Sequence, residues 1–379
     1  MSDLSTAWPV LTRYEGDTLR EIGFPLGGIG TGTIALGGRA ELRDFEICNR
    51  PAKGFTPPCT FFALRTQAAE QPAVTRVLEG VLRPPYSGSF GVSSATAGLP
   101  RMRHVSMEAA YPFARYSLND PDVPLKVYLE AFNPLIPLNV DQSSLPLAVL
   151  RYVLVNSSEE RVQASIAGSL LNFIGAEISY RGSGPSISPG GLGALPGGNV
   201  NEVRRTTATD GTPLSGLLMR SERVPPRTPE DGTMALVVLD EDASCRRTWG
   251  PTRWNRHLLT FWEDFSSDGR FDDPEQASPS PEGQGQIGSV AVSAWVEPRS
   301  EVAFTFLLSW RFPHRTAAGC GWDTLDESGG WIGNYYARHY TDAWDAAQRI
   351  APQLSQLEEA SLRFTRAFVS SNLPQSAKE

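Results

Sequence analysis

LAVLRYVLV, residues 147–155, consists mostly of leucine, β-branched and aromatic side chains, a composition that favours a β-strand. Segments of the same character recur at residues 60–65, 125–132, 163–171, 234–239, 289–296 and 301–310. The 35 glycines and 30 prolines are spread along the chain and interrupt helices. Strand patterns do not alternate with long helical patterns, which argues against a doubly wound sheet. We therefore predict a mainly β fold of antiparallel strands with one face buried.

Two segments break this strand pattern. Residues 181–199 (RGSGPSISPGGLGALPGGN) are almost wholly glycine, serine and proline, and we predict a mobile surface loop there. Residues 266–285 are polar and rich in proline and aspartate, and we predict a second loop.

The end of the chain has helical character. From about Tyr335 onward, apolar residues such as Trp344 and Ile350 recur at helical spacing, and Pro352 should end or kink this helix. A second helix follows, with Leu354, Leu357, Phe364 and Phe368 along one side. The apolar faces of these helices need a partner. Either they fold back on the strands, or they lead into a further domain.

Composition excludes several classes of protein. A net charge of -8 without a basic stripe argues against nucleic-acid binding. The N-terminus has no basic region followed by an apolar one, and no apolar stretch reaches the roughly 18 residues of a membrane span. The 4 cysteines are widely spaced, which favours free thiols in a reducing cytoplasm. The 4 histidines are scattered, so we expect neither a metal nor a cofactor.

The glycine-rich run at residues 23–38 (GFPLGGIGTGTIALGG) contains a formal dinucleotide fingerprint, Gly-x-Gly-x-x-Ala, at residues 30–35. Such a fingerprint must open a helix. Thr31, Thr33 and Ile34 favour strand instead, and Gly37 and Gly38 would break a helix. We predict two short strands in which small residues let another backbone come close.

A charged cluster follows at residues 39–55 (RAELRDFEICNRPAKGF). Pairs of carboxylates can act as acid and nucleophile on a sugar. In a regular strand, Asp44 and Glu46 would share one face, while Glu41 would lie on the other. The alternative is a strand whose charges pair with each other, and the sequence alone makes none of these carboxylates catalytic. Of the 9 tryptophans, Trp295 and Trp310 lie beside apolar strands, where we expect core packing.

Residues 23–55 resemble the opening signature of glycoside hydrolase family 116, which includes the non-lysosomal glucosylceramidase and bacterial β-glucosidases. Further segments resemble that family in the same order. They are YPFA at residues 111–114, EAFNPLIPLNVDQSSLP at 130–146, SWRFPH at 309–314 and NYYARHYTDAW at 334–344. Together these segments cover the chain from about residue 20 to its end.

The resemblance implies a large two-sheet antiparallel β-sandwich at residues 1–330 and a helical linker at 331–379, leading to an (α/α)6 catalytic domain. It also implies retaining hydrolysis of a β-glucoside or glucosylceramide by a Glu nucleophile and an Asp acid/base of that domain. SNLP at residues 371–374 resembles the junction before it, and the sequence ends five residues later. No position here can receive either catalytic residue. We therefore expect a non-catalytic N-terminal domain whose partner is this catalytic domain, in cis or in trans.

Two other functions stay open. The chain could be a stand-alone carbohydrate-binding or scaffold module, although no strand shows a row of aromatic residues at a spacing of two. It could also be a lone enzyme using Glu41, Asp44 or Glu46. For the contact with a catalytic domain or with its substrate cleft we predict Arg43, Asp44 and Arg50, whose charges are set among small and apolar residues as in a desolvated contact.

Overall fold

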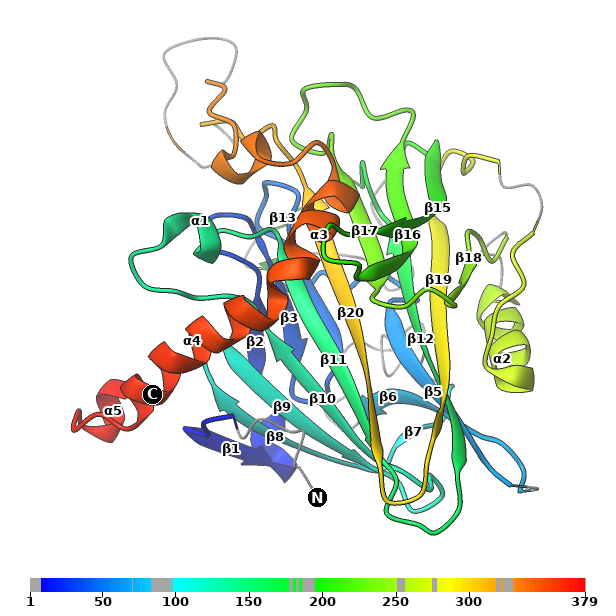
Figure 1. Ribbon diagram of the computed structural model, residues 1–379. Helices are drawn as coiled ribbons and strands as arrows, with labels where there is room; N and C mark the ends of the chain where they lie inside the picture. Colours follow the sequence, from blue (N-terminus) through cyan, green and yellow to red (C-terminus); the bar gives the residue numbers. More distant parts are fainter. Residues whose placement is uncertain are drawn as a thin grey trace.

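The computed structural model describes residues 8–69, 71–82, 96, 98–176, 180–181, 184–185, 195–250, 256–274, 278–317, 322 and 330–378. Strands dominate this part of the chain and form several antiparallel sheets, followed by helices at the C-terminal end (Figure 1). The predicted fold class, mainly β with a C-terminal helical segment, is confirmed.

Two sheets are large. The nine-stranded sheet has the order β1 (Thr12–Glu15), β8 (His104–Ala110), β9 (Phe113–Asn119), β10 (Lys126–Phe132), β11 (Leu147–Val155), β20 (Glu301–Arg311), β17 (Thr233–Val238), β16 (Pro213–Ser221) and β15 (Asn199–Thr207). The six-stranded sheet has the order β18 (Ser244–Arg246), β19 (Gln286–Val296), β12 (Val162–Asn172), β5 (Phe61–Ala68), β6 (Val74–Gly80) and β7 (Arg101–Met102). Neighbouring strands are antiparallel, except that β6 and β7 pair in parallel.

Two smaller sheets complete the β-structure. The first has the order β2 (Gly23–Leu26), β3 (Thr33–Gly37) and β4 (Leu42–Glu46), and the second pairs β13 (Tyr180–Arg181) with β14 (Gly184–Pro185). The segments that we predicted as strands from their composition coincide with or overlap β5, β10, β11, β12, β17, β19 and β20. The glycine-rich run forms β2 and β3, so the prediction of two short strands is also confirmed.

The nine-stranded sheet is the middle layer of the molecule because its central strands are buried on both faces. In β11, Leu150 and Leu154 belong to the core that this sheet shares with the six-stranded and three-stranded sheets. Leu147 and Val149 of the same strand belong to a second apolar cluster on the opposite face. This division is expected, since successive side chains of a strand point to opposite faces.

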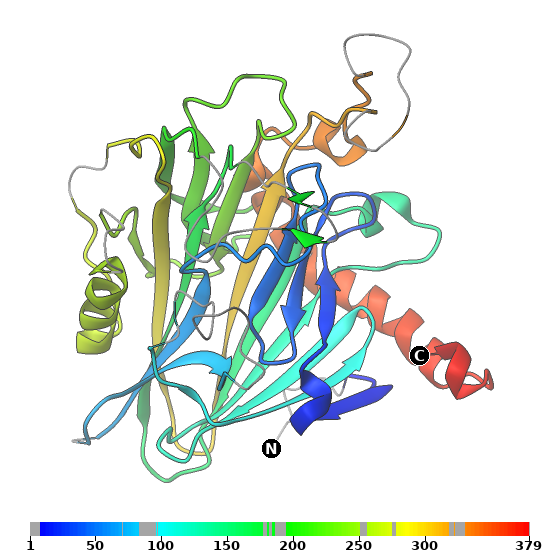
Figure 2. The same cartoon turned by 180° about the vertical axis from the view of Figure 1, so that it is seen from behind.

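A helical strap covers the second face. We define the strap as α3 (Ala343–Ile350), η5 (Ala351–Gln353) and α4 (Leu354–Val369). It runs obliquely over the sheet and ends beyond it, where α5 (Gln375–Lys378) follows (Figures 1 and 2). Trp344, Ile350 and Leu357 are buried in the second cluster. Of the two alternatives left open by the sequence, folding back on the strands therefore holds for the first part of the strap.

The predictions of the two loops need correction. Helix α2 (Arg256–Asp268) was not predicted, and it extends to Asp268, so the loop expected at residues 266–285 begins only after that residue. Most of residues 181–199 lie outside the described residues, but the end of this segment is not a surface loop, because Leu195 is 3% exposed and Asn199 opens β15.

The two tryptophans expected in the core differ. Trp310 is fully buried, as predicted. Trp295 is 46% exposed, and the guanidinium of Arg161 lies 4.3 Å from its ring centroid. The expectation was wrong for Trp295 because its side chain on β19 points away from the core. An apolar sequence alone does not show which part of a strand is covered by other layers of the fold. None of the helices in the described ranges has the length and apolar character that spanning a membrane requires.

Candidate functional site

One end of the sandwich brings together segments that lie far apart in the sequence. We define the loop end as residues 27–32, 133–146, 312–317 and 330–334, which adjoin the ends of β2, β10, β11 and β20. Each of these segments contains or borders a stretch that carries the family resemblance. The resemblance is therefore concentrated at one place in the fold, although it is spread over three hundred residues of sequence.

The glycine-rich stretch is fixed at the loop end by close backbone contact. The amide of Gly28 donates a hydrogen bond to the carbonyl of Leu145 at 3.0 Å. A Cβ atom on Gly28 would lie only 2.3 Å from the Leu145 amide nitrogen, so this position has no room for a larger residue. The indole Nε1 of Trp310 donates to the carbonyl of Thr31 at 2.7 Å. The glycines thus permit close packing of backbones, as predicted.

Asn49 joins further segments at this end and was missed by sequence reasoning. Its Nδ2 donates to the carbonyls of Phe312 at 3.2 Å and Pro229 at 3.1 Å, and its Oδ1 accepts from Asn334 Nδ2 at 2.6 Å. The backbone of Asn49 has a φ of 60°, a conformation that asparagine tolerates better than most residues. An asparagine before Arg-Pro hints at a turn, but no local pattern identifies these partners.

Asp44 and Arg43 are bound to each other and to their own neighbourhood. Asp44 is 5% exposed, and its carboxylate accepts from the Gly54 amide at 2.5 Å and from Arg43 Nε at 3.2 Å. The pairing of β3 with β4 shifts between Thr33 and Ala35, and Asp44 has a φ of 49°. The regular alternation expected for this strand is therefore interrupted at Asp44.

Arg50 lies apart from that pair. Its Nη2 contacts the Glu230 carboxylate at 2.5 Å. Glu46 accepts from the Ala52 amide at 3.0 Å and contacts Lys53 Nζ at 2.7 Å. Glu41 contacts Arg39 at 3.2 Å. The structure thus brings Arg43 and Asp44 together but not Arg50. It favours the alternative in which the charges of residues 39–55 pair within the chain.

Exposed apolar side chains gather around the loop end. Leu138, Val140 and Ile29 are all more than 60% exposed, and Trp331 is 63% exposed. Tyr335 links them to helix α1 (Val140–Ser143), because its hydroxyl donates to Asp141 Oδ1 at 2.8 Å. This hydrogen bond and the charge of Asp141 raise the pKa of Tyr335.

An apolar groove with a volume of about 650 Å³ lies beside the loop end. It runs between β1, β8, β2 and the end of α4. We define the apolar groove by its main lining residues, Tyr14, Phe24, Tyr111, Leu135, Phe364 and Phe368. Of the charged side chains, Glu21 and Lys378 also line it.

A buried cysteine and a buried histidine, Cys59 and His257, lie in contact with each other. Cys59 Sγ lies 3.0 Å from His257 Nε2. Burial raises the pKa of Cys59 to about 12 and lowers that of His257, so both groups are neutral near pH 7. This is a structural contact and not an activated thiolate.

Cys48, Cys59 and Cys245 are free, as predicted, whereas Cys320 lies outside the described residues. Within the ranges that the structure describes, no cluster of His, Cys, Asp and Glu could hold a metal ion.

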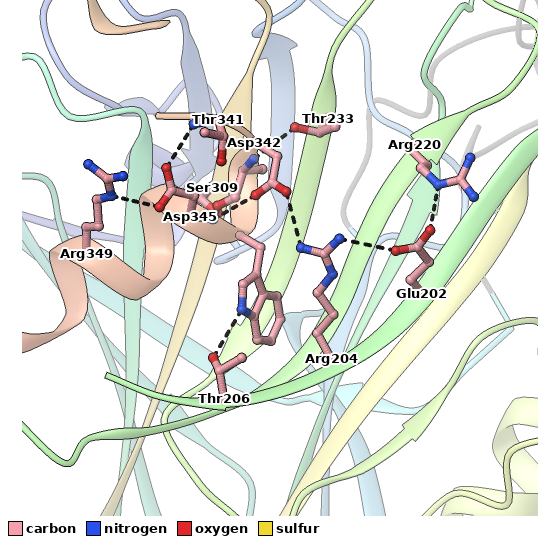
Figure 3. A network of polar contacts seen from close by, with 12 residues as sticks. Glu202, Arg204, Thr206, Arg220, Thr233, Ser309, Thr341, Asp342, Asp345 and Arg349 are labelled. Carbon is pink, nitrogen blue, oxygen red and sulfur yellow. Dashed lines mark hydrogen bonds and ion pairs between the residues drawn. The ribbon is translucent and has the colours of Figure 1, made fainter. Parts of the chain in front are cut away.

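Asp342, Ala343 and Trp344 end the segment at residues 334–344 that resembles family 116. They anchor the strap to the sheet (Figure 3). Asp342 caps α3 by accepting from the Asp345 amide at 2.7 Å, and its other oxygen contacts Arg204 of β15 at 3.2 Å. Trp344 Nε1 donates to Thr206 Oγ1 at 3.1 Å. These residues fix the start of the strap on the sheet.

Most of the chain is similar to a known protein family. The family model described as "beta-glucosidase 2, glycosyl-hydrolase family 116 N-term" matches residues 23–359. Among solved structures, a putative kojibiose phosphorylase from the human microbiome is 9% identical with a TM-score of 0.35, covering 95% of this chain and 32% of that one. A polysaccharide lyase is 9% identical with a TM-score of 0.31, covering 77% and 33%.

The chain spans about a third of the length of these two solved structures. The family model, in contrast, takes in nearly the whole sandwich and most of the strap. It includes every segment of the loop end and the anchor of α3. The chain therefore belongs to the N-terminal domain family of glycoside hydrolase family 116.

Proposed function

We propose that this chain is the non-catalytic N-terminal domain of a retaining β-glucosidase or glucosylceramidase, and that it supports hydrolysis carried out by an (α/α)6 catalytic domain. Membership of the family carries this proposal. Retaining hydrolysis uses two carboxyl groups about 5 Å apart across the scissile bond. Asp44 and Glu46 instead accept hydrogen bonds from backbone amides of residues 52–54, which supports a structural role for both.

Within this proposal, residues 1–330 form the sandwich and residues 331–379 form the linker toward the catalytic domain. The β-glucoside or glucosylceramide binds through that domain. Arg43, Asp44 and Arg50 remain the sequence prediction for the interdomain contact. Arg43 and Arg50 keep 35% and 40% of their side chains exposed beside their internal partners, and Asp44 keeps 8%.

Hydrolysis of an aryl β-glucoside tests the proposal. We expect no turnover by the purified chain alone. We expect turnover, with retention of the anomeric configuration in the sugar product, when the chain is co-expressed with an (α/α)6 domain of this family. Glu41→Gln, Asp44→Asn and Glu46→Gln should leave the activity of the pair within about twofold, provided that each variant folds. Turnover by the chain alone that Glu46→Gln abolishes would overturn the proposal.

Exposed aromatic residues in and next to the loop end favour a second function, a stand-alone carbohydrate-binding module. Trp331 and Tyr335 expose 63% and 51% of their surface, and amphipathic rings of this kind can stack on sugars. Titration of the chain with glucosides separates the two functions. Saturable binding that Trp331→Ala removes would favour the module, whereas the proposal above predicts no binding by the chain alone.

A further inference from the structure

We propose that the apolar groove is the docking site for the catalytic domain, and that the apolar face of a helix of that domain occupies it. This inference rests on the proposed function and adds the contact surface. The proposed contact surface is the groove and not the charged residues at positions 43, 44 and 50.

The first argument is that the groove is open although a helix forms one of its walls. Phe364 of α4 is 37% exposed, and Tyr111 on the opposite side is 46% exposed. The Phe364 and Phe368 rings are stacked at 6.1 Å, and Tyr111 packs on Phe24 at 5.8 Å. The two walls thus present aromatic surface without filling the space between them. A cavity of about 650 Å³ is large enough for several apolar side chains.

The second argument is the position of the C-terminal end of the chain. Lys378 lines the groove, and its Nζ donates to the carbonyls of Val369 at 2.9 Å and Ser371 at 2.8 Å. These bonds turn α5 back toward the end of α4. In the proposed function, this helical segment is the linker toward the catalytic domain. The groove therefore lies beside the linker.

The third argument is continuity with the loop end. Leu135 lines the groove, and its amide donates to Ser361 Oγ of α4 at 3.0 Å. Three residues further on, Leu138 is fully exposed, and Val140 is 66% exposed. Helix α1 and the end of α4 lie on the same side of the sandwich in both views (Figures 1 and 2). Exposed apolar side chains gathered on one side of a molecule in this way are typical of an interaction site.

The charges of the groove fit an apolar helix as occupant. Glu21 and Lys378 have opposite signs and are the charged side chains in its lining, so the aromatic walls face one another across uncharged space. The centre of a stable interface is similarly depleted of charge. The predicted residues Arg43, Asp44 and Arg50 are bound within the chain and are not needed for this contact.

Binding of the full chain to a separately expressed catalytic domain of a family 116 β-glucosidase tests the inference. Phe364→Glu keeps a good helix former at an exposed position and should weaken association about tenfold or more. The matched control is Leu259→Glu on α2, which is 62% exposed on the opposite side of the sandwich and should leave association unchanged.

Hydrogen exchange on the unmutated pair gives a readout that needs no variant. We expect slower amide exchange in residues 135–140 and 361–369 upon association, and no change in α2. If the pair is active and bound but Phe364→Glu binds normally and these residues are not protected, the docking site is wrong and the proposed function stands. If the unmutated pair neither associates nor hydrolyses an aryl β-glucoside, the proposed function fails and the docking site fails with it.

Discussion

The two parts of the strap share an amphipathic pattern but have different surroundings. Up to Leu362, which is 3% exposed, the apolar side chains of the strap are buried on the nine-stranded sheet, with Trp344 2% and Leu357 2% exposed. After Leu362 the amphipathic pattern continues, but Phe364 is 37% exposed. The end of the helix projects beyond the sheet (Figure 1). The difference shows that a helical pattern reports an apolar face, while the neighbouring layer decides whether the face is covered.

The largest expected effect comes from the start of the strap. Trp344→Ala removes a buried ring and its hydrogen bond to Thr206, and should lower the free energy of unfolding by about 3–5 kcal/mol. Phe364→Ala in the projecting part should cost about 1 kcal/mol or less. Denaturant unfolding followed by circular dichroism measures both values. Equal losses would show that the two parts are packed alike and would break the comparison.

The next effect concerns the ion pair that fastens the middle of α4. Arg151 of β11 donates to both oxygens of Glu358, at 2.7 and 3.0 Å, and to Glu130 at 2.8 Å. Trp8 Nε1 also donates to Glu358 at 3.0 Å. Burial alone would lower the pKa of Arg151, but the hydrogen bonds and charges of Glu358 and Glu130 outweigh burial and raise it.

Glu358→Gln should therefore lower the free energy of unfolding by roughly 2–3 kcal/mol. The neighbouring Glu359→Gln is the matched control. Glu359 has a side chain that is 74% exposed and contacts Arg363 at 3.5 Å, so the loss of its charge should cost about 0.5 kcal/mol or less. The same unfolding measurement applies. A harmless Glu358→Gln would show that the apolar cluster alone holds the strap.

Ser361 lies next to the boundary between the two parts. Its hydroxyl is buried, accepts from the Leu135 amide at 3.0 Å and donates to the Leu357 carbonyl at 2.7 Å. Ser361→Ala leaves the Leu135 amide without this acceptor and should cost about 1–2 kcal/mol. The exposed Ser355→Ala on the same helix should change stability by a few tenths of a kcal/mol. Hydrogen exchange at Leu135 should accelerate only in the Ser361 variant.

The smallest effect is a pH dependence of the unfolding free energy that comes from Tyr340, just before the strap begins. Burial raises the pKa of Tyr340 above its ordinary value. The unfolded chain therefore releases this proton at lower pH than the folded one, so the stability is present below about pH 10 and is lost as the pH rises further. Tyr340→Phe should make the alkaline fall in unfolding free energy less steep than in the unmutated chain. An equally steep fall would assign the dependence to other groups.

The sequence predicted the central strands well because they are buried on both faces over much of their length and consist mostly of apolar residues. β11 and β20 are of this kind, and their bounds match within one residue. Helix α2 was missed although Leu258, Phe261 and Phe265 recur at helical spacing on its buried side. Local composition cannot show that this short face meets the core.

The site was harder to predict than the fold. The motifs at the loop end were recognisable, but their convergence depends on contacts such as Trp310 with Thr31, which are 279 residues apart. The charged residues of positions 39–55 attracted attention because carboxylates carry chemistry. Their partners, such as Glu230 for Arg50, are set by the tertiary fold. The groove has no sequence signature, since ordinary apolar residues from separate elements form it.

The order of the nine-stranded sheet also bears on solubility. Its two edges are β1 and β15, and an unpaired strand edge can recruit a strand from another molecule. β1 has only 4 residues and carries Arg13, whose side chain is 71% exposed. β15 carries Glu202, Arg204 and Arg205 along its length. Charged side chains at both edges hinder pairing with a strand of another molecule, so both edges of this broad open sheet are protected.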